Sequence, residues 1–336
     1  MRIYLAICVI SFYCLPLYTV SEVQSKNAPI PSKPGTSHMT LDHGIASQQG
    51  NRPYQEDRHD IHITHDSCIY GVYDGHGGAA LSEALSHGTP YVTSLAHAVQ
   101  TEIAYKDLGH ICNDWERRIL YKTPHMLLAG STASCVHCDT TNDTARVLNI
   151  GDSRTFIVTQ YGTMYATTDQ TARAEYRRIL ALGGIISLGD TYITKAEDGN
   201  YWDHCPLFPE PIKITPDTAD TLIQYTNKTV RCPSLIPSRA FGDYRKDTYG
   251  NFYKTPGVTI QPEVHNETLS DIKAIVIATD GIWNTISHPK MYYLVARALG
   301  ASCTAQETAS YIMQNVHTYD NAMVLVVFPK FHSNTK

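Results

Sequence analysis

A short apolar segment that runs into an acidic, glycine-rich turn carries the clearest chemistry in this chain. The segment Tyr70–Gly78 reads YGVYDGHGG, and its expected strand ends directly before Asp74, Gly75 and His76. Glycine lets a ligand approach the backbone closely, because it has no side chain. A carboxylate, a backbone carbonyl and an imidazole are therefore presented together at the end of a rigid strand.

Further acidic residues repeat this design along the chain. They lie at expected strand ends, beside glycine or another polar turn residue, and comprise Glu56, Asp57, Asp152, Asp243, Asp280 and Asp320. The basic residues within the same motifs are Arg52, Arg154 and Arg239. Carboxylates at the ends of buried strands are unfavourable unless they are paired or bind a metal. The excess of carboxylate therefore predicts hard divalent cations, Mg²⁺ or Mn²⁺, held by oxygen ligands and water.

Such a centre would suit phosphate chemistry. Two divalent ions about 3.5–4 Å apart lower the pKa of a shared water towards about 7 and clamp a phosphoryl group for in-line displacement. Arg52 could grip the phosphate through parallel N–H groups, or could instead form a salt bridge to an acid. His76 could protonate the leaving oxygen, or could be a loop histidine without a chemical role.

The composition indicates a globular protein. Of the 336 residues, 43% are hydrophobic and 18% are charged, which is typical of folded rather than disordered chains. The net charge is −5 and no basic block occurs in the sequence. Binding of nucleic acid through phosphate neutralisation is therefore not expected.

The first residues differ from a cytosolic pattern. Arg2 precedes the apolar run Ile3–Leu17, which is followed by small residues. This predicts a signal peptide over residues 1–21, with a flexible linker over 22–39; an uncleaved anchor or a buried strand are the alternatives. We expect a secreted protein or one in an organelle lumen, with no stable membrane span after cleavage, and a signal-anchored protein as the alternative. Asn142, in an expected hairpin tip, is the most accessible of three glycosylation sequons.

The cysteines fit an oxidising compartment only in part. Two of the nine lie in the expected signal peptide, so an odd number remains and at least one thiol is free or pairs with another chain. Cys135 and Cys138 lie in an expected strand and point to opposite faces, so buried thiols are expected there rather than a disulfide or zinc ligands. Cys205 and Cys232 could pair in an oxidising lumen.

The order of the expected elements indicates an α+β fold. Strands joined by hairpin-length turns are expected over 61–73 and over 133–159, with a helical stretch broken at Pro90 over 79–121 between them. Two helices are expected over 291–316, the second opened by a capping box at Thr304. A final buried strand is expected over 322–328. Residues 185–233 have no regular pattern and form an irregular, flap-like insertion. Hairpins and paired helices favour antiparallel sheets faced by helices over a doubly wound parallel sheet.

Seven motifs in a fixed order carry a resemblance to a known family. They span roughly His43–Phe328 and read RPYQED, YDGHGG, GSTA, NIGDSR, SRAFGD, ATDGIWN and DNAMVLVV. In these motifs the chain resembles the metal-dependent protein serine/threonine phosphatases of the PPM or PP2C type. The resemblance implies an αββα sandwich, with two antiparallel sheets between helix pairs and a metal cleft at one edge. The phosphatase domain would occupy residues 40–331.

The resemblance also implies a set of metal ligands. Asp74 would bridge two Mg²⁺ or Mn²⁺ ions. Glu56 and the carbonyl of Gly75 would bind one of these ions. Asp280 and Asp320 would bind the other.

Further residues take roles around these ions in the same resemblance. Arg52 would hold the phosphate, Asp57 would hydrogen-bond a metal-bound water, and His76 would be the general acid. Asp152 matches a position that helps to hold a weaker third ion. Asn284 departs from the family, which often has an acid there, so we expect this third ion to bind weakly.

We therefore expect an enzyme that hydrolyses phosphoserine and phosphothreonine esters on phosphorylated proteins. A dinuclear Mg²⁺ or Mn²⁺ centre with a metal-bridging water as nucleophile would carry the reaction. The alternative is a catalytically weak or silent module of the same fold that recruits a partner through its flap. The complete set of core acids favours the enzyme.

Overall fold

The structure, a computed structural model, describes most of the expected domain. The described residues are 38–87, 105–182, 186–188, 193–195, 201–203, 212–213, 230–231 and 235–332. The expected signal peptide, nearly all of the expected linker, most of the insertion over 185–233 and the possible Cys205–Cys232 pair lie outside the described residues.

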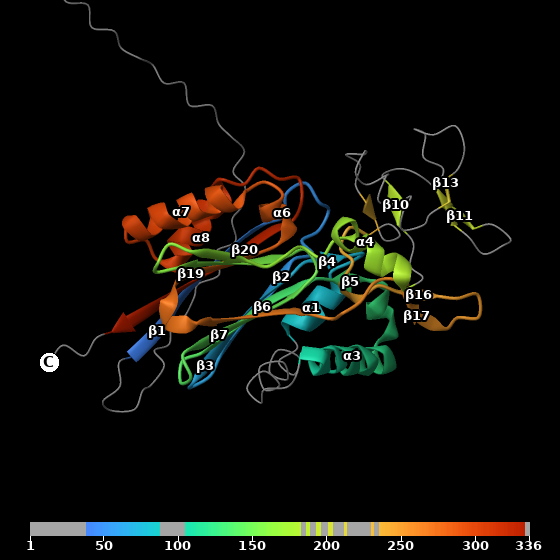
Figure 1. The fold of residues 1–336 in the computed structure, drawn as a ribbon, viewed down its shortest axis with the longest axis horizontal. Helices are drawn as coiled ribbons and strands as arrows, with labels where there is room; N and C mark the ends of the chain where they lie inside the picture. Colours follow the sequence, from blue (N-terminus) through green and yellow to red (C-terminus); the bar gives the residue numbers. More distant parts are fainter. Residues whose placement is uncertain are drawn as a thin grey trace, which may run out of the picture.

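Two five-stranded antiparallel sheets form the centre of the molecule (Figure 1). The first sheet contains, in spatial order, β1 (His38–Gln48), β20 (Ala322–His332), β19 (Ile272–Ala278), β8 (Arg154–Thr159) and β9 (Met164–Ala166). The second contains β18 (Glu263–Thr268), β7 (Thr144–Ile150), β6 (Ala133–Asp139), β3 (Ser67–Tyr73) and β2 (Arg58–Ile63). Every neighbouring pair in both sheets is antiparallel. The predicted α+β class is therefore confirmed.

The alternation of side chains along each strand divides the core into layers. In β3, Tyr70 and Val72 point into the core between the sheets, whereas Ile69 and Tyr73 point to the outer face. Strands buried on both faces need apolar residues at nearly every position. β3 meets this requirement, since all its residues are buried.

Helix pairs cover the two outer faces, as Figure 1 shows. The first sheet packs on α7 (His288–Gly300) and α8 (Ala305–Gln314), and the second on α1 (Ala80–Ser86) and α3 (Tyr105–Lys122). The predicted αββα sandwich is therefore confirmed. The expected capping box is present at the start of α8, where Thr304 and Glu307 bond to each other's backbone N–H groups.

Shorter elements connect the sandwich to its edge. They are β4 (Gly75–His76), η1 (Pro124–Leu128), β5 (Gly130–Ser131), α4 (Ala172–Ala181), β15 (Phe241–Gly242), β16 (Tyr244–Lys246), β17 (Phe252–Lys254), η2 (Leu269–Asp271) and α6 (Asp280–Trp283). The insertion contains β10 (Ser187–Leu188), β11 (Ile193–Lys195), β12 (Tyr201–Asp203), β13 (Ile212–Lys213) and β14 (Val230–Arg231). Strands β15, β5 and β4 form a small three-stranded sheet.

Cys68, Cys135, Cys138 and Cys303 are free thiols. Cys135 lies in the outer core beneath α1 and α3, and Cys138 lies in the core between the sheets. The prediction that they point to opposite faces is therefore confirmed. Asn142 is exposed in the turn between β6 and β7, as expected of a hairpin tip.

Strand β1 was not expected from the sequence, and it begins at His38, just inside the expected linker. It pairs along its whole length with β20, from His38 opposite His332 to Gln48 opposite Ala322. β20 extends beyond the expected 322–328 because its further residues also pair with β1. Each strand provides the partner that lets the other continue, and this pairing joins segments far apart in the sequence.

None of the helices in the described part of the chain combines the length and the apolar composition that a membrane span requires.

The contact between β1 and α8 yields a prediction about stability. A Cβ atom added at Gly44 would lie 2.2 Å from the backbone N and Cα of Gln306 in α8. The added Cβ would force the backbone of β1 or of α8 to move. We therefore expect Gly44→Ala to lower the free energy of unfolding by at least about 1–3 kcal/mol. Gly300→Ala is the matched control, since a Cβ there meets nothing within 4 Å, and its effect should stay within about 1 kcal/mol. Urea denaturation of the three proteins measures this, and equal stabilities would contradict it.

Candidate active site

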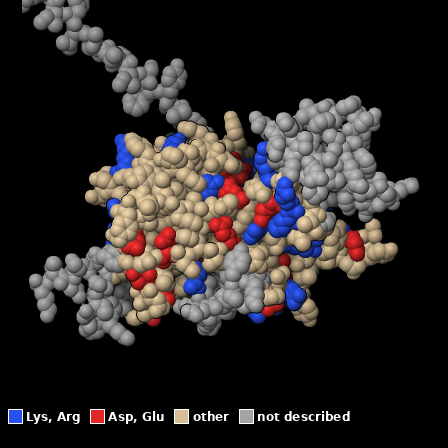
Figure 2. Space-filling view, viewed as in Figure 1, with Lys and Arg blue, Asp and Glu red and all other residues tan. Residues whose placement is uncertain are grey.

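Eight of the predicted site residues line one cavity of about 410 Å³. They are Arg52, Glu56, Asp74, Gly75, His76, Asp152, Asp280 and Asp320. Figure 2 draws one face of the molecule and shows Asp and Glu side chains gathered near its centre, with Lys and Arg side chains beside them. The ninth predicted residue, Asp57, lies behind the cavity and is 1% exposed. The structure therefore brings together acids that are far apart in the sequence.

Gly75 has no side chain, and this lets the loop that carries Glu56 lie against the backbone that follows Asp74. A Cβ at Gly75 would be 2.7 Å from the carbonyl oxygen of Glu56 and 2.6 Å from Oγ of Ser82. Ser82, on α1, donates from Oγ to that same carbonyl at 2.6 Å. The glycine that follows Asp74 is thus required by close packing at this point.

Asn321 ties the same loop to the start of β20. Its Oδ1 accepts from the backbone N–H of Glu56 at 2.9 Å, and its Nδ2 donates to the carbonyls of Gln49 and Tyr54. The neighbouring Asp320 is thereby fixed beside Glu56. No role was predicted for Asn321 from the sequence, although it lies in the DNAMVLVV motif.

Thr279 connects the buried Asp57 to the same region. Its Oγ1 donates to Oδ2 of Asp57 at 2.9 Å and accepts from the backbone N–H of Met323 at 3.0 Å. Asp280 follows directly and opens α6. The ends of β19 and the start of β20 therefore hold three of the acids in one place.

Asp152 lies in the turn that links β7 of the second sheet to β8 of the first. Gln170 accepts from the backbone N–H of Gly151 at 2.8 Å and donates to the carbonyl of Asn149 at 3.2 Å. Both contacts fix the turn that carries Asp152, whose side chain is buried.

The buried acids repel one another. The pKa of Asp57 is raised to about 8, first by burial and then by the charges of Asp280 and Asp320. Burial and the charge of Asp280 likewise raise the pKa of Asp152 to about 8. The pKa of Asp74 is raised well above its ordinary value, first by burial and then by the Asp57 carboxylate. Nearby positive charge would reverse these shifts.

Arg52 is the arginine that reaches this cavity in the described part of the chain. Its Nη2 donates to Oδ2 of Asp320 at 2.7 Å. The salt bridge left open by the sequence is thus present, and it engages a predicted metal ligand. Two other arginines of the motifs pair outside the cavity, Arg154 with Asp169 and Arg239 with Glu175.

The donor chemistry of the cavity fits hard cations. Oδ1 of the buried Asp57 has no hydrogen-bond partner among the residues described, and neighbouring carboxylates leave a deficit of positive charge. Within the described ranges, no three His, Cys, Asp or Glu side chains already form a closed ligand group for one ion. Mg²⁺ is commonly bound by one or two carboxylates while it keeps several waters. An open arrangement of carboxylate oxygens, with room for water, is compatible with this coordination of Mg²⁺.

His76 contacts Asp243, an acid at an expected strand end for which no role was predicted. Its Nε2 lies 2.9 Å from Oδ1 and 3.1 Å from Oδ2 of Asp243. Burial lowers the pKa of His76, but the Asp243 carboxylate outweighs burial, so the pKa is raised overall. The Gly-Asp pair that ends SRAFGD marked Asp243 as a candidate site residue, but no sequence signal linked it to His76.

Asn284 donates from Nδ2 to Oδ2 of Asp280 at 3.1 Å and is exposed at the end of α6. The amide thus holds a predicted ligand without adding negative charge.

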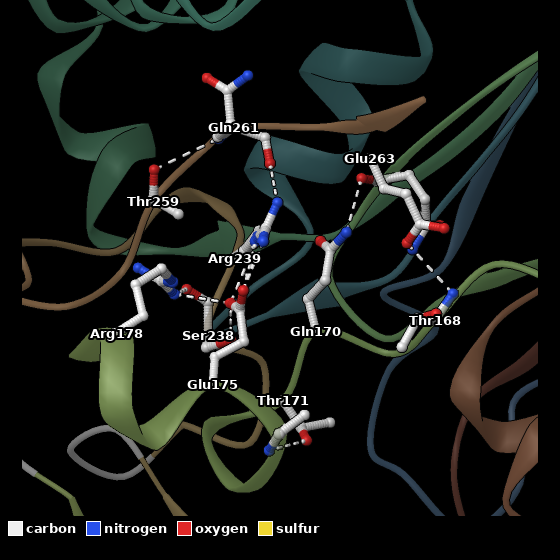
Figure 3. A network of polar contacts seen from close by, with 12 residues as sticks. Thr168, Gln170, Thr171, Glu175, Arg178, Ser238, Arg239, Thr259, Gln261 and Glu263 are labelled. Atoms are coloured by element: carbon white, nitrogen blue, oxygen red, sulfur yellow. Dashed lines mark hydrogen bonds and ion pairs between the residues drawn. The ribbon is translucent and has the colours of Figure 1, made fainter. Parts of the chain in front are cut away.

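A second polar network lies beside the cavity and holds the segment that leads to Asp243. Figure 3 shows Arg178, Ser238 and Arg239 converging on Glu175 of α4. Arg239 also donates to the carbonyl of Gln261 at 2.8 Å. Burial raises the pKa of Glu175, but the hydrogen bonds from Arg239, Arg178 and Ser238 lower it to about 2 overall. Glu175 is therefore charged at neutral pH.

This geometry agrees with comparisons with known proteins. The family model for Protein phosphatase 2C matches residues 31–322. The chain belongs to the protein phosphatase 2C family. This is a family of serine/threonine protein phosphatases, so the resemblance seen in the seven motifs is confirmed.

Individual relatives are distant in sequence. Probable protein phosphatase 2C 61 of Arabidopsis thaliana is 24% identical over 310 residues, covering 87% of this chain and 84% of the relative. A phosphatase from a pathogenic strain of Toxoplasma gondii has a similar structure, with a TM-score of 0.61 at 18% identity, covering 88% of this chain and 96% of that one. The serine-threonine phosphatase 2C from Toxoplasma gondii gives a TM-score of 0.57 at 18% identity, covering 94% and 100%. These structures share the fold of this family member.

The Glu175 network yields a prediction with a defined pH dependence. We expect Glu175→Gln to lower the free energy of unfolding at pH 7 by roughly 1–3 kcal/mol, because hydrogen bonds to a charged group are lost. The folded-state pKa of about 2 lies below the ordinary value. The contribution of Glu175 is thus complete above about pH 4.3 and is lost as the pH falls towards 2. Urea denaturation of both proteins at several pH values should show the difference shrinking over that window; a difference independent of pH would contradict the charge-based account.

Proposed function

We propose that this member of the protein phosphatase 2C family hydrolyses phosphoserine and phosphothreonine esters on proteins, using Mg²⁺ or Mn²⁺ in the acidic cavity. The observation that carries the proposal is the convergence of carboxylates from separate strand ends on one cavity that also contains Arg52 and His76. Acids gathered in this way, with little opposing positive charge, favour divalent cations as their partners.

The core ligands would be shared between two ions. Asp74 would contribute to both, Glu56 and the Gly75 carbonyl to one, and Asp280 and Asp320 to the other. When bound, such ions supply the positive charge that clamps a phosphoryl group and lowers the pKa of water towards about 7. The unpartnered Oδ1 of Asp57 supports a role for this residue in orienting water near the site.

The remaining groups act on the phosphate ester itself. Arg52 presents a planar set of N–H donors suited to phosphate oxygens. It shares Asp320 with the predicted metal centre, so phosphate binding and metal binding are coupled through that carboxylate. His76 would give a proton to the oxygen of the departing serine or threonine, which stabilises this poor leaving group as the P–O bond breaks.

The decisive experiment measures phosphate release from a phosphothreonine peptide and from p-nitrophenyl phosphate, with Mn²⁺ and with EDTA. Release that depends on Mn²⁺ supports the enzyme. Normal folding without release from either substrate supports a silent binding module instead.

Removal of the central ligand should abolish this activity. Loss of groups that merely support metal ligands costs about 10–100-fold, so Asp74→Asn should cost more than this on both substrates. Asp66→Asn serves as the control, because Asp66 is exposed and pairs with His65 away from the cavity. A turnover of more than about a tenth of the wild-type value in Asp74→Asn at saturating Mn²⁺ would refute the dinuclear centre.

A weak third ion is the second element of the proposal. Asn284 presents an amide where a carboxylate would bind a hard cation better, and Asp152 then supports that ion with little help. Asn284→Asp should lower the Mn²⁺ concentration that gives half-maximal activity and should increase the rise in melting temperature on adding Mn²⁺. Asp152→Ala should change both quantities little. An unchanged half-point in Asn284→Asp, or a collapse of activity in Asp152→Ala, would count against a weak third ion.

A further inference from the structure

Asp243 has a backbone conformation that needs an explanation. Its φ is +56°, and it follows Gly242, whose φ is +76°. Residues other than glycine are uncommon in this left-handed region, and such strain persists where the surrounding structure imposes it. Strained residues of this kind cluster at functional sites.

The surrounding structure holds this backbone from both sides. The backbone N–H of Asp243 donates to the carbonyl of Ala129 at 3.0 Å, and the N–H of Thr255 donates to the carbonyl of Asp243 at 3.0 Å. The buried Glu116 of α3 accepts from the N–H of Gly242 and from Nζ of Lys254, each at 2.7 Å. The ion pair between the buried Glu116 and the half-buried Lys254 therefore fixes the position of the turn that carries Asp243.

The small sheet formed by β15, β5 and β4 creates the space in which Asp243 meets His76. Gly130, on the middle strand, lies between Gly242 and His76 in the register. A Cβ at Gly130 would be 2.0 Å from Nε2 of His76 and 2.6 Å from both carboxylate oxygens of Asp243. A side chain at this position would occupy the place where the two groups meet.

We propose that Asp243 is the positioning residue for His76: its carboxylate binds Nε2 of the imidazole and leaves Nδ1 as the nitrogen that serves the substrate. This inference rests on the proposed function and specifies how the general acid is held. Both side chains line the cavity, and their exposed fractions are 26% for His76 and 6% for Asp243. The buried carboxylate thus acts from behind the imidazole.

The proton movement follows from this arrangement. As the bond between phosphorus and the serine or threonine oxygen breaks, that oxygen takes the proton from Nδ1. The imidazole is left neutral and keeps the proton on Nε2, which continues to donate to Asp243. A fixed donor atom on a rigid side chain shortens the search for productive geometry.

The His65–Asp66 pair shows that a contact between Asp and His is not by itself evidence of a catalytic histidine. Its side chains are 59% and 65% exposed, and neither lines the acidic cavity. The His76–Asp243 pair differs by its burial, its imposed backbone conformation and its place beside the predicted metal ligands. The exposed pair is therefore the natural control.

The test compares the phosphothreonine peptide with p-nitrophenyl phosphate, whose leaving group needs little protonation. Asp243→Gly removes the carboxylate without backbone strain, and Asp243→Asn keeps an acceptor oxygen and tolerates the left-handed conformation. General-acid catalysis contributes about 10²–10⁴-fold. We expect Asp243→Gly to lower kcat on the peptide by about 10²-fold and on p-nitrophenyl phosphate by less than about 5-fold. Asp243→Asn should recover part of the loss on the peptide.

A double variant separates positioning from a purely structural role. Residues that act as one unit show non-additive losses, so adding Asp243→Gly to His76→Gln should not lower kcat on the peptide beyond His76→Gln alone. Melting temperatures of all variants check folding, and Asp66→Asn should leave both substrates unaffected. Equal losses on the two substrates in the well-folded Asp243→Asn, or multiplied losses in the double variant, would overturn the inference.

The same measurements keep this inference distinct from the proposed function. If His76→Gln lowers kcat equally on the two substrates, the general-acid assignment itself is wrong. If His76→Gln affects mainly the peptide and the Asp243 variants do not, only the positioning role of Asp243 is wrong.

Discussion

The mutual repulsion of carboxylates in one buried place is the constraint on which the rest of this structure depends. Asp57, Asp74 and Asp280 reach the same region from different strands. The charges of Asp57 and Asp280 raise the pKa of Asp74, and the charge of Asp280 also raises the pKa of Asp57. Separate, flexible loops would move apart to relieve this repulsion. The two apolar sheets prevent this, because moving a strand end would disturb the packed core between them. The family's acidic cavity is thus maintained by hydrophobic burial elsewhere.

Several cationic side chains lie around the cavity, but they form ion pairs with acids that do not line it. Arg154 pairs with Asp169, Arg239 with Glu175, and Lys254 with Glu116. Each of these cations is neutralised by its own acid and holds a loop in place. The loops are therefore fixed without reducing the negative charge of the cavity itself. Arg52 is the exception, since it pairs with a cavity acid, and its exposed position leaves it near any phosphate that enters.

Features local in sequence could be predicted, whereas contacts between distant loops could not. The acids were found from their place at strand ends, and the capping box from the spacing of Thr304 and Glu307. The contact of His76 with Asp243 joins residues 167 positions apart, and nothing in either motif specifies the other. β1 was missed because its polar positions mask the alternation expected of a strand, and its pairing is set by β20 alone. Arg52 had two open interpretations, and the structure contains its salt bridge.

The pairing of β1 with β20 also governs when this molecule can assemble. β1 lies at the edge of its sheet with β20 as its neighbour there, so an early segment of the nascent chain has no sheet partner until the segment containing β20 leaves the ribosome. Its apolar residues Leu41 and Ile45, buried in the finished core, stay uncovered during synthesis and are candidates for chaperone binding. Closing such a distant contact is slow. Asp320 lies just before β20, so the acidic cavity is completed by the same late event.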